Sequence, residues 1–166
     1  AQTRFIPRSE RWYNLSTHLP WIGMRTADLG GAHVEYCRGI SNPVGVKVGP
    51  SMDAAWVQGL CHALNPDKEA GRLVLIHRMG AKHAEAKLPG LIECVRATGV
   101  PVLWVCDPMH GNTETTAAGV KTRRFENILA ELETAFKVHR AMGSYLGGVH
   151  FELTGEDVTE CTGGAR

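Results

Sequence analysis

The sequence lacks several features that would place it in a familiar class of protein. Its 166 residues carry a formal net charge of +1 with the histidines neutral, so the overall charge does not favour nucleic acid or an anionic membrane as a partner. No stretch approaches the roughly 20 consecutive apolar residues of a membrane span. The start of the chain does not show the charged, apolar and small-residue order of a signal peptide. These absences predict a soluble protein with neither nucleic acid nor a membrane among its partners.

Paired cysteines and nucleotide-binding motifs are also absent. The five cysteines are an odd number without CxxC spacing, and a chain of 166 residues is too large for a disulfide scaffold. We therefore expect reduced thiols at Cys37, Cys61, Cys94, Cys106 and Cys161. The glycines form neither GxGxxG nor a Walker loop, which disfavours a nucleotide site. No internal repeat or low-complexity segment indicates a solenoid or a disordered arm.

What the sequence does contain is a series of short apolar runs, each bounded by Gly, Pro or Asn. Such runs are typical of buried strands. They predict five strands, at 19–23, 43–49, 72–80, 100–108 and 147–155. Residues 24–42 show no clear helical stripe, so we expect a loop with at most one short helix there.

Helical patterns lie between the later strands. Trp56 and Leu60 are four residues apart after a candidate cap at Ser51. A second stripe consists of Leu88, Leu91, Ile92 and Val95, and a third of Phe125, Ile128, Leu129, Leu132 and Phe136. Gly99 can adopt a left-handed conformation after the last turn of the second helix, and Pro101 prevents its continuation.

This alternation predicts an α/β fold, with a single domain over residues 1–166. Near-continuous apolar strands separated by helices indicate a parallel sheet covered by helices, either doubly wound or barrel-like. A complete eight-unit barrel takes about 250 residues, so five strands would form only part of one. A doubly wound domain fits the length better, and composition does not separate the two.

Candidate functional residues stand where the predicted strands end, because parallel α/β folds bind ligands at the carboxyl ends of their strands. They are Arg25, Lys47, Arg78, His110 and Glu152. Three cations at one rim would repel one another unless an anion lay between them, and arginine offers a bidentate fork to phosphate or carboxylate. A single cation at a strand tip is usually solvated or ion-paired. Recurrence at successive strand ends favours a phosphorylated substrate.

His110 and Glu152 are also compatible as ligands of a divalent metal ion. Two ligands are too few for a complete site, and a lone histidine in a turn is more often a hydrogen-bonded structural residue. Cys106 and Asp107 precede His110 in "CDPMHGNT", but neighbouring strand residues face opposite ways, so at most one faces the same centre. The remaining histidines have no mutual ligand spacing, and we assign structural or surface positions to His18, His33, His62, His77, His83, His139 and His150.

Five motifs, "SNPVGVKVGP", "HRMGAKH", "CDPMHGNT", "GVKTRRF" and "GGVHFELTGEDVTECTGG", together resemble the class II 3-deoxy-D-arabino-heptulosonate 7-phosphate (DAHP) synthases. The resemblance runs from about Trp21 to Gly164. It implies a (β/α)8 TIM barrel, of which this chain would supply about the third to the seventh strand. It also implies a transferase of the shikimate pathway that condenses phosphoenolpyruvate with erythrose 4-phosphate and water and releases phosphate. The expected location is the cytoplasm or, in a plant, the plastid.

The resemblance also implies roles for individual residues. The groups that hold phosphoenolpyruvate correspond to Arg25, Lys47 and Arg78, and a further active-site lysine to Lys121. The expected catalytic residues are Lys47, Arg78, His110 and Lys121. His110 and Glu152 correspond to two of four ligands of a required divalent metal, with Mn²⁺ expected and Co²⁺, Zn²⁺ or Fe²⁺ as alternatives. Full-length members are expected to form homo-oligomers.

Several parts of the family site have no counterpart in this sequence. The metal-binding cysteine, a "KPR" substrate segment and the final metal-binding aspartate belong to the first, second and eighth strands. Met24 in "WIGMRT" stands where the family usually has an acidic residue that helps to place the attacking water, and methionine cannot ionise. We therefore expect a fragment of a DAHP synthase that is inactive as this chain alone. The alternative is a truncated or degenerate relative that binds phosphorylated ligands or a partner without turnover.

Overall fold

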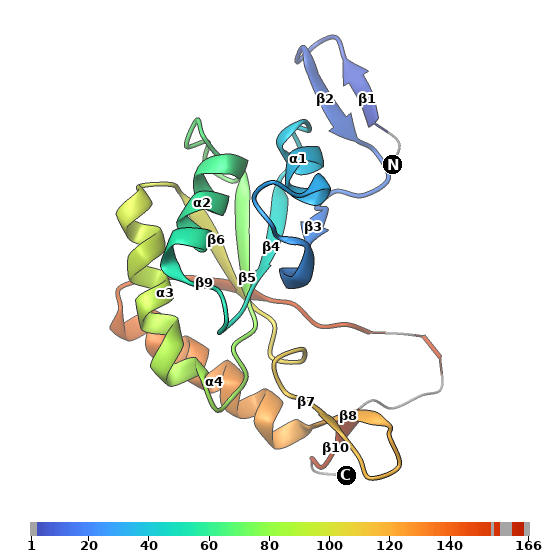
Figure 1. Ribbon diagram of the computed structural model, residues 1–166, viewed down its shortest axis with the longest axis vertical. Coiled ribbons are helices and arrows are strands. Elements are labelled where there is room, and N and C mark those ends of the chain that lie inside the picture. The colour runs from blue at the N-terminus through green and yellow to red at the C-terminus, as the bar shows by residue number, and fades with distance from the viewer. Residues whose placement is uncertain (1–2, 154, 157–160, 165–166) are drawn as a thin grey trace.

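The computed structural model describes residues 3–153, 155–156 and 161–164 (Figure 1). Its main element is a parallel sheet of five strands in the order β3-β4-β5-β6-β9. The strands are β3 (Trp21–Ile22), β4 (Val44–Val48), β5 (Leu73–His77), β6 (Val102–Cys106) and β9 (Leu146–Val149). All five predicted strands are present, each shorter than predicted, and the sheet confirms the α/β class.

Helices connect these strands and cover one face of the sheet. They are the 3-10 helix η1 (Met24–Thr26) and the α-helices α1 (Ala32–Arg38), α2 (Ala54–Leu64), α3 (Ala84–Thr98) and α4 (Phe125–Ala141). Figure 1 shows α2, α3 and α4 along one side of the sheet. The connection over residues 24–42 holds η1 and α1, so the expected short helix is accompanied by a single 3-10 turn.

Alternation along the strands separates the two faces of the sheet. Val44, Val46 and Val48 belong to the hydrophobic core beneath the helices. Gly45 and Lys47, which alternate with them, face the other side. Full burial of such an aliphatic side chain stabilises a fold by about 1.5–3 kcal/mol, so the core fixes which strand residues face away from the helices.

The face away from the helices is concave. The rings of Trp21 on β3 and His150 beyond β9 meet edge to face with centroids 5.2 Å apart, although β3 and β9 are the two edge strands of the sheet. Contact between residues of the two edges requires the sheet to curl. Trp21 and Leu103, in the same row of this face, are 53% and 44% exposed. A curled parallel sheet with helices outside is compatible with a partial barrel.

Local sequence explains where α2 begins and α3 ends. The side chain of Asp53 accepts a 2.8 Å hydrogen bond from the Trp56 amide and caps α2, so the prediction of Ser51 as the cap was wrong. Asp53 stands three residues before Trp56, the spacing at which a side-chain oxygen reaches an unpaired amide of the first turn. α3 ends at Gly99 in the left-handed conformation with φ +65°, as predicted.

α4 turns a different face to the core from the one that its apolar residues predicted. Phe125, Leu129 and Phe136 of the predicted stripe are 46%, 45% and 54% exposed. The buried residues of α4 are Ile128, Glu131, Ala135, Val138 and His139. A carboxylate and an imidazole are buried here because both have hydrogen-bond partners inside, which an apolar pattern cannot reveal.

Two smaller sheets were not predicted. β1 (Thr3–Ile6) and β2 (Arg11–Asn14) form an antiparallel hairpin near the end of the main sheet where β4 and β5 begin (Figure 1). β7 (Thr113–Thr115), β8 (Lys121–Arg124) and β10 (Cys161–Thr162) form a second sheet beyond the carboxyl ends of β4 and β5. Short strands with several charged or polar residues carry little of the apolar alternation on which strand prediction depends.

The last predicted strand, at 147–155, leaves the main sheet early. β9 ends at Val149, and the next amide, of His150, still donates to the Cys106 carbonyl at 2.8 Å. β6 ends at Cys106, and Pro108 has no N–H with which to continue the ladder. Thr154 of this prediction, and residues 157–160 of the last motif, lie outside the described residues.

Two further expectations concern the helices and the thiols. Among the described residues, no helix combines the length and apolar character that crossing a membrane requires. The cysteines form no disulfide within the described ranges, as expected. Burial raises the pKa of the Cys37 thiol, and that of Cys61 to about 12.

Candidate active site

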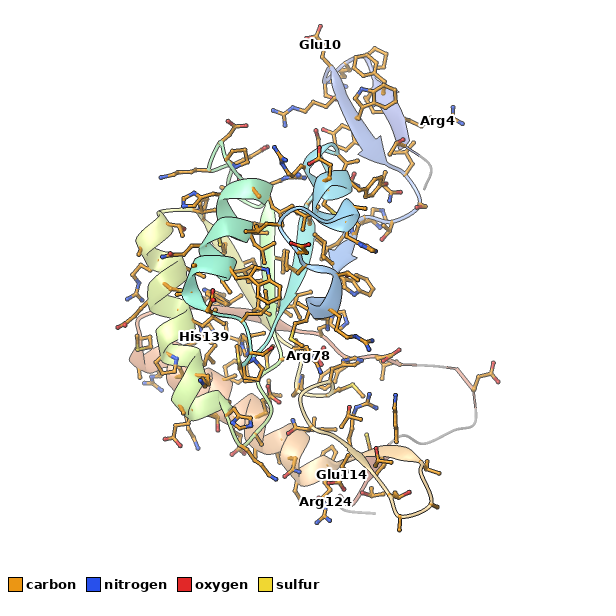
Figure 2. All side chains as sticks on the ribbon, viewed as in Figure 1. Arg4, Glu10, Arg78, Glu114, Arg124 and His139 are labelled. Atoms are coloured by element: carbon orange, nitrogen blue, oxygen red, sulfur yellow. The ribbon has the colours of Figure 1, made fainter. Side chains whose placement is uncertain are left out.

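The carboxyl ends of four strands bring polar side chains together at one rim of the concave face. Lys47 lies on β4, and Arg78 directly follows β5. Asp107 and His110 follow β6, and Glu152 follows β9. Figure 2 shows Arg78 where β4 and β5 end. We call these five residues the rim cluster.

Asp107 is the centre of the rim cluster. Its side chain is completely buried and accepts hydrogen bonds from Lys47 Nζ and from the His110 ring, whose Nδ1 lies 2.7 Å from Asp107 Oδ2. The other oxygen, Oδ1, accepts from the amides of Met109 at 3.0 Å and His110 at 3.1 Å. Four donors on one carboxylate fix both the turn after β6 and the two side chains that flank it.

The electrostatics of this pair follow from its burial. Burial acts to raise the pKa of Asp107, but the hydrogen bonds from Lys47 and from the His110 amide outweigh it, so the pKa of Asp107 is lowered and the carboxylate stays ionised. Burial lowers the pKa of Lys47 and Arg78 adds to this, while Asp107 opposes both. The rim therefore holds a desolvated ammonium whose nearest counter-charge is Asp107.

His110 and Glu152 fit a divalent metal in one respect that the structure shows directly. Asp107 holds Nδ1 of His110, which leaves Nε2 to face Glu152 Oε2 at 2.9 Å. Two ligands that each lie about 2.1 Å from one ion are separated by such a distance. A carboxylate on the second ring nitrogen is also the arrangement that orients metal-binding histidines. His110 and Glu152 are 33% and 61% exposed in their side chains, so the pair is open to a ligand.

Arg78 binds the loop that carries His110 and lies beside Met24. Its Nη2 donates to the carbonyl oxygen of His110, and its Nη1 lies 3.8 Å from Met24 Sδ. Arg78 Nε is buried without a hydrogen-bond partner among the described residues. Met24 therefore lies beside this guanidinium.

Two predicted site residues are not joined to the rim cluster. Arg25 lies exposed on η1, next to Met24, and Met24 is its neighbour that reaches Arg78. Lys121 lies exposed at the start of β8, opposite Thr115 in the second small sheet. In the described part of the chain, no hydrogen bond or ion pair joins Lys121 to the rim. Four of the six predicted site residues, Lys47, Arg78, His110 and Glu152, thus lie together.

A second group of polar side chains lies behind the rim, in the core between the sheet and α4. His77, Cys106 and Glu131 place one ligand atom each within 4.8 Å of one another, an arrangement that could hold a metal ion. His139 extends this group, because its Nε2 lies 3.4 Å from Nε2 of His77. We call these four residues the core cluster; Figure 2 shows His139 on the helix side. Sequence spacing did not reveal it, because its members come from β5, β6 and α4.

Sequence reasoning treated Asp107 as an alternative to Cys106 and did not single out Glu131. The rule that only one of Cys106 and Asp107 faces the rim is confirmed, since Asp107 contacts Lys47 and Cys106 lies in the core cluster. The alternation of strand side chains could therefore have identified Asp107 as a rim residue once Cys106 was assigned to the core. Glu131 had a weaker signal, an acidic residue three positions after Ile128 on the same helix face.

Known proteins resemble this chain over nearly its whole length. The model of the Class-II DAHP synthetase family matches residues 1–166. A phospho-2-dehydro-3-deoxyheptonate aldolase of Streptomyces coelicolor is 49% identical over 164 residues, which cover 99% of this chain and 36% of that protein. Proteins with the same enzyme name from Neurospora crassa and Mycolicibacterium smegmatis are 47% and 49% identical over 160 and 154 residues. Those matches cover 95% and 93% of this chain, and 33% of each relative.

The chain spans about a third of the length of the curated relatives that it matches. The family match also includes the hairpin of β1 and β2, which precedes the motifs on which the sequence resemblance rested. Because the family model matches every residue, this chain belongs to the class II DAHP synthase family.

Proposed function

We propose that this chain forms the central part of the active site of a DAHP synthase, which condenses phosphoenolpyruvate with erythrose 4-phosphate and water to DAHP and phosphate. One observation carries the proposal: Lys47, Asp107, His110 and Glu152 form a continuous chain of contacts at one rim, with Arg78 bound to the same loop. The five strands would be the third to the seventh of a (β/α)8 barrel. In such barrels the active site lies at the carboxyl face.

The cations of the rim would bind the phosphate and carboxylate of phosphoenolpyruvate. Arg78 offers a planar fork beside His110, and Lys47 offers a point charge that is already desolvated. Binding an anion here offsets the burial of Lys47, because a second negative group joins Asp107 beside the ammonium. The proposal extends to Arg25 and Lys121 through their motifs alone.

His110 and Glu152 would supply two of the ligands of a divalent metal, for which Mn²⁺ is proposed. When bound, the metal would supply Lewis-acid polarisation of the substrate aldehyde. In that state Asp107 would accept a hydrogen bond from His110 Nδ1–H, which would leave the lone pair of Nε2 at the open side for the metal.

The remaining chemistry concerns the two substrates. C3 of phosphoenolpyruvate forms a bond to the aldehyde carbon, whose oxygen takes up a proton. C2 gains positive character, and water adds there and loses one proton. The hydroxyl at C2 then loses its remaining proton and forms the C=O double bond as the bond from C2 to the phosphate oxygen breaks, which releases inorganic phosphate. Held by Lys47 and Arg78, phosphoenolpyruvate would keep C3 towards the aldehyde, and such orientation is a large part of catalysis in bimolecular reactions.

A second reading is that the chain binds phosphorylated ligands without turnover. Met24 beside Arg78 favours it, because a thioether cannot orient or deprotonate a water as a carboxylate can. The chain also spans about a third of its relatives and contains two of the four expected metal ligands.

Binding and turnover assays test both readings. Purified chain with Mn²⁺ is titrated with phosphoenolpyruvate by calorimetry, and phosphate release is then followed with and without erythrose 4-phosphate. We expect binding without turnover for this chain alone, and at least tenfold weaker binding in Arg78→Ala. Arg140→Ala, which removes an exposed arginine at the end of α4, is the matched control. Phosphate release that depends on erythrose 4-phosphate would reject the binding-only reading, and equal binding in both variants would reject the proposed site.

A further inference from the structure

Two loops of the rim touch backbone to backbone. One follows β5 and carries Arg78; the other follows β6 and carries His110. A Cβ on Gly80 would lie 2.6 Å from the carbonyl oxygen of Gly111, and a Cβ on Gly111 would lie 2.4 Å from the Gly80 nitrogen. Only glycine allows this approach, because any side chain at either position would collide with the backbone of the other loop. A small shift of one loop relative to the other would therefore break the contact or cause a clash.

A carboxylate from α4 joins these two loops from below. Glu131 is fully buried, and its Oε1 accepts a 2.8 Å hydrogen bond from the amide of Met79, the residue after Arg78. Its Oε2 accepts a 2.6 Å hydrogen bond from the side chain of Asn112, two residues after His110. One residue thus binds the loop of Arg78 with one oxygen and the loop of His110 with the other.

Asn112 makes the connection reciprocal. Its Oδ1 accepts from the amide of Ala81 at 2.9 Å, and its Nδ2 also donates to the carbonyl of Pro108 at 2.8 Å. The amide orientation is thereby determined, because turning it over would face donors to donors at Ala81 and acceptors to acceptors at Pro108. Asn112 must therefore present Nδ2 to Glu131, which requires an acceptor at that point.

A buried carboxylate is a costly choice for the inner face of a helix, since an ionised group loses its hydration there. Among the described residues, Glu131 forms no ion pair with a cation, and its hydrogen bonds go to groups of the two rim loops. A residue that served the packing of α4 alone would be aliphatic, as Ile128 and Val138 are on the same face. The hydrogen bonds of Glu131 therefore stabilise the two rim loops rather than the packing of α4.

We propose that Glu131 is a positioning residue, which holds the loops of Arg78 and His110 at the mutual spacing that anion and metal binding require. The inference rests on the proposed function of those two residues. Glu131 contacts neither substrate nor metal in this role, and acts through Met79 and Asn112. Its participation in the core cluster offers a competing role as a metal ligand with His77 and Cys106, and the experiment separates the two.

Glu131→Gln is the informative change. Glutamine has the same shape but one acceptor oxygen, so its NH₂ must face either the Met79 amide or Asn112 Nδ2, both of which are donors. Asn112→Ala removes the other half of the connection and serves if Glu131→Gln does not fold. Two controls lie on α4: Glu133→Gln changes an exposed carboxylate, and Val138→Ala destabilises the buried face without touching the rim loops.

The first measurement is amide hydrogen exchange of the full chain without ligands. We expect exchange at Met79 in Glu131→Gln, and at Ala81 in Asn112→Ala, to be at least tenfold faster than in Val138→Ala, after matching the variants for global stability by urea unfolding. The second measurement is the affinity for Mn²⁺, followed by the electron paramagnetic resonance of the free ion. We expect about tenfold weaker binding in Glu131→Gln and no change in either control.

The outcomes separate the hypotheses. Unchanged exchange at Met79 and Ala81, or faster exchange with unchanged Mn²⁺ affinity, overturns the positioning role. If wild-type chain binds neither Mn²⁺ nor phosphoenolpyruvate, the proposed function fails, and exchange alone still decides whether Glu131 holds the loops together. The competing role predicts a different result when the proteins are treated with a chelator. If the wild type keeps its metal while Glu131→Gln and Cys106→Ser both lose it, Glu131 is a ligand of a metal site in the core, and the inference is wrong.

Discussion

The rim cluster and the core cluster contain residues that are adjacent in sequence, but burial affects the charges of the two clusters differently. Arg78 follows His77 and Asp107 follows Cys106, yet one member of each pair faces the open rim and the other faces the closed core. The rim holds the ion pair of Lys47 and Asp107, and the same Asp107 oxygen also contacts the His110 ring. The core holds groups that burial drives towards their neutral forms. Successive residues at a strand end thus provide charge on one face and neutral polarity on the other.

The pKa values express this difference. Burial lowers the pKa of His77 to about 3, with a further contribution from His139, and that of His139 to about 4. Burial also raises the pKa of the Cys106 thiol, and that of Glu131 to about 7, although amides of Gly80 and Met79 oppose the shift of Glu131. At the rim the same burial is overcome at Asp107, because Lys47 supplies a cation.

Removing the central charge of the rim should have the largest effect. Asp107→Asn leaves the ammonium of Lys47 buried without its counter-ion, and breaking a buried pair costs about 3–5 kcal/mol. We expect the free energy of unfolding in urea to fall by about that amount. Asp67→Asn, at an exposed position, should change it by less than about 0.5 kcal/mol. A loss below 1 kcal/mol in Asp107→Asn would show that Lys47 finds another partner.

Metal affinity should distinguish the two faces of one strand end. We expect His110→Ala and Glu152→Ala each to weaken Mn²⁺ binding about 10- to 100-fold, because each removes a proposed ligand. Cys106→Ser, one residue from Asp107, should leave the affinity unchanged, since its side chain faces the core. His62→Ala, an exposed histidine on α2, is the control. Weaker binding in Cys106→Ser alone would move the metal from the rim to the core cluster.

Acid should destabilise the protein through the core cluster. His77 and His139 have folded-state pKa values below 6.5, so their contribution to stability is complete above pH 6.5. It is lost as pH falls towards about 4 for His139 and about 3 for His77. Glu131 acts in the opposite direction: its contribution is complete below pH 4.5 and is lost as pH rises through about 7. Each group changes stability by about 1.4 kcal/mol per pH unit, so the net loss from pH 6.5 to pH 5 is about 2 kcal/mol.

Urea unfolding at pH 6.5 and pH 5 measures this balance. In His139→Gln one imidazole of the core cluster remains against Glu131, so the contribution of the core cluster to the difference between the two pH values should nearly vanish. Burial also lowers the pKa of His150, which leaves a smaller loss of stability on acidification in both proteins. Asp107 does not disturb the comparison, because its lowered pKa places its own contribution below this range. Stability that rises on acidification of the wild type would contradict the neutral character of the core cluster.

Sequence patterns revealed the sheet and most of the rim for physical reasons that do not extend to the core cluster. A run such as residues 43–49 is apolar, short and bounded by Asn and Gly, so strand and rim position follow from local chemistry. His77, Cys106 and Glu131 come together only through the packing of α4, and no local pattern encodes that contact. The apolar residues of α4 even favoured the wrong face, since Phe125, Leu129 and Phe136 point away from the core. Lys121 lies on β8, which pairs with β7 in a separate small sheet. Because neither strand was predicted, its distance from the rim cluster could not be foreseen.

The smallest predicted effect concerns Met24, which lies beside Arg78 at the rim. Met24 Sδ lies 3.8 Å from Arg78 Nη1, so a carboxylate in its place would pair with the guanidinium. Because such a partly solvated pair is worth about 0.2–1 kcal/mol, Met24→Glu should weaken the binding of inorganic phosphate about two- to fivefold by competing for Arg78. Calorimetric titration with phosphate measures the change, with Met52→Glu, at a second half-buried methionine, as the control for added charge. Unchanged phosphate binding in Met24→Glu would mean that Arg78 does not face the anion. In that case the other proposed cations, Lys47 above all, would be left to bind it.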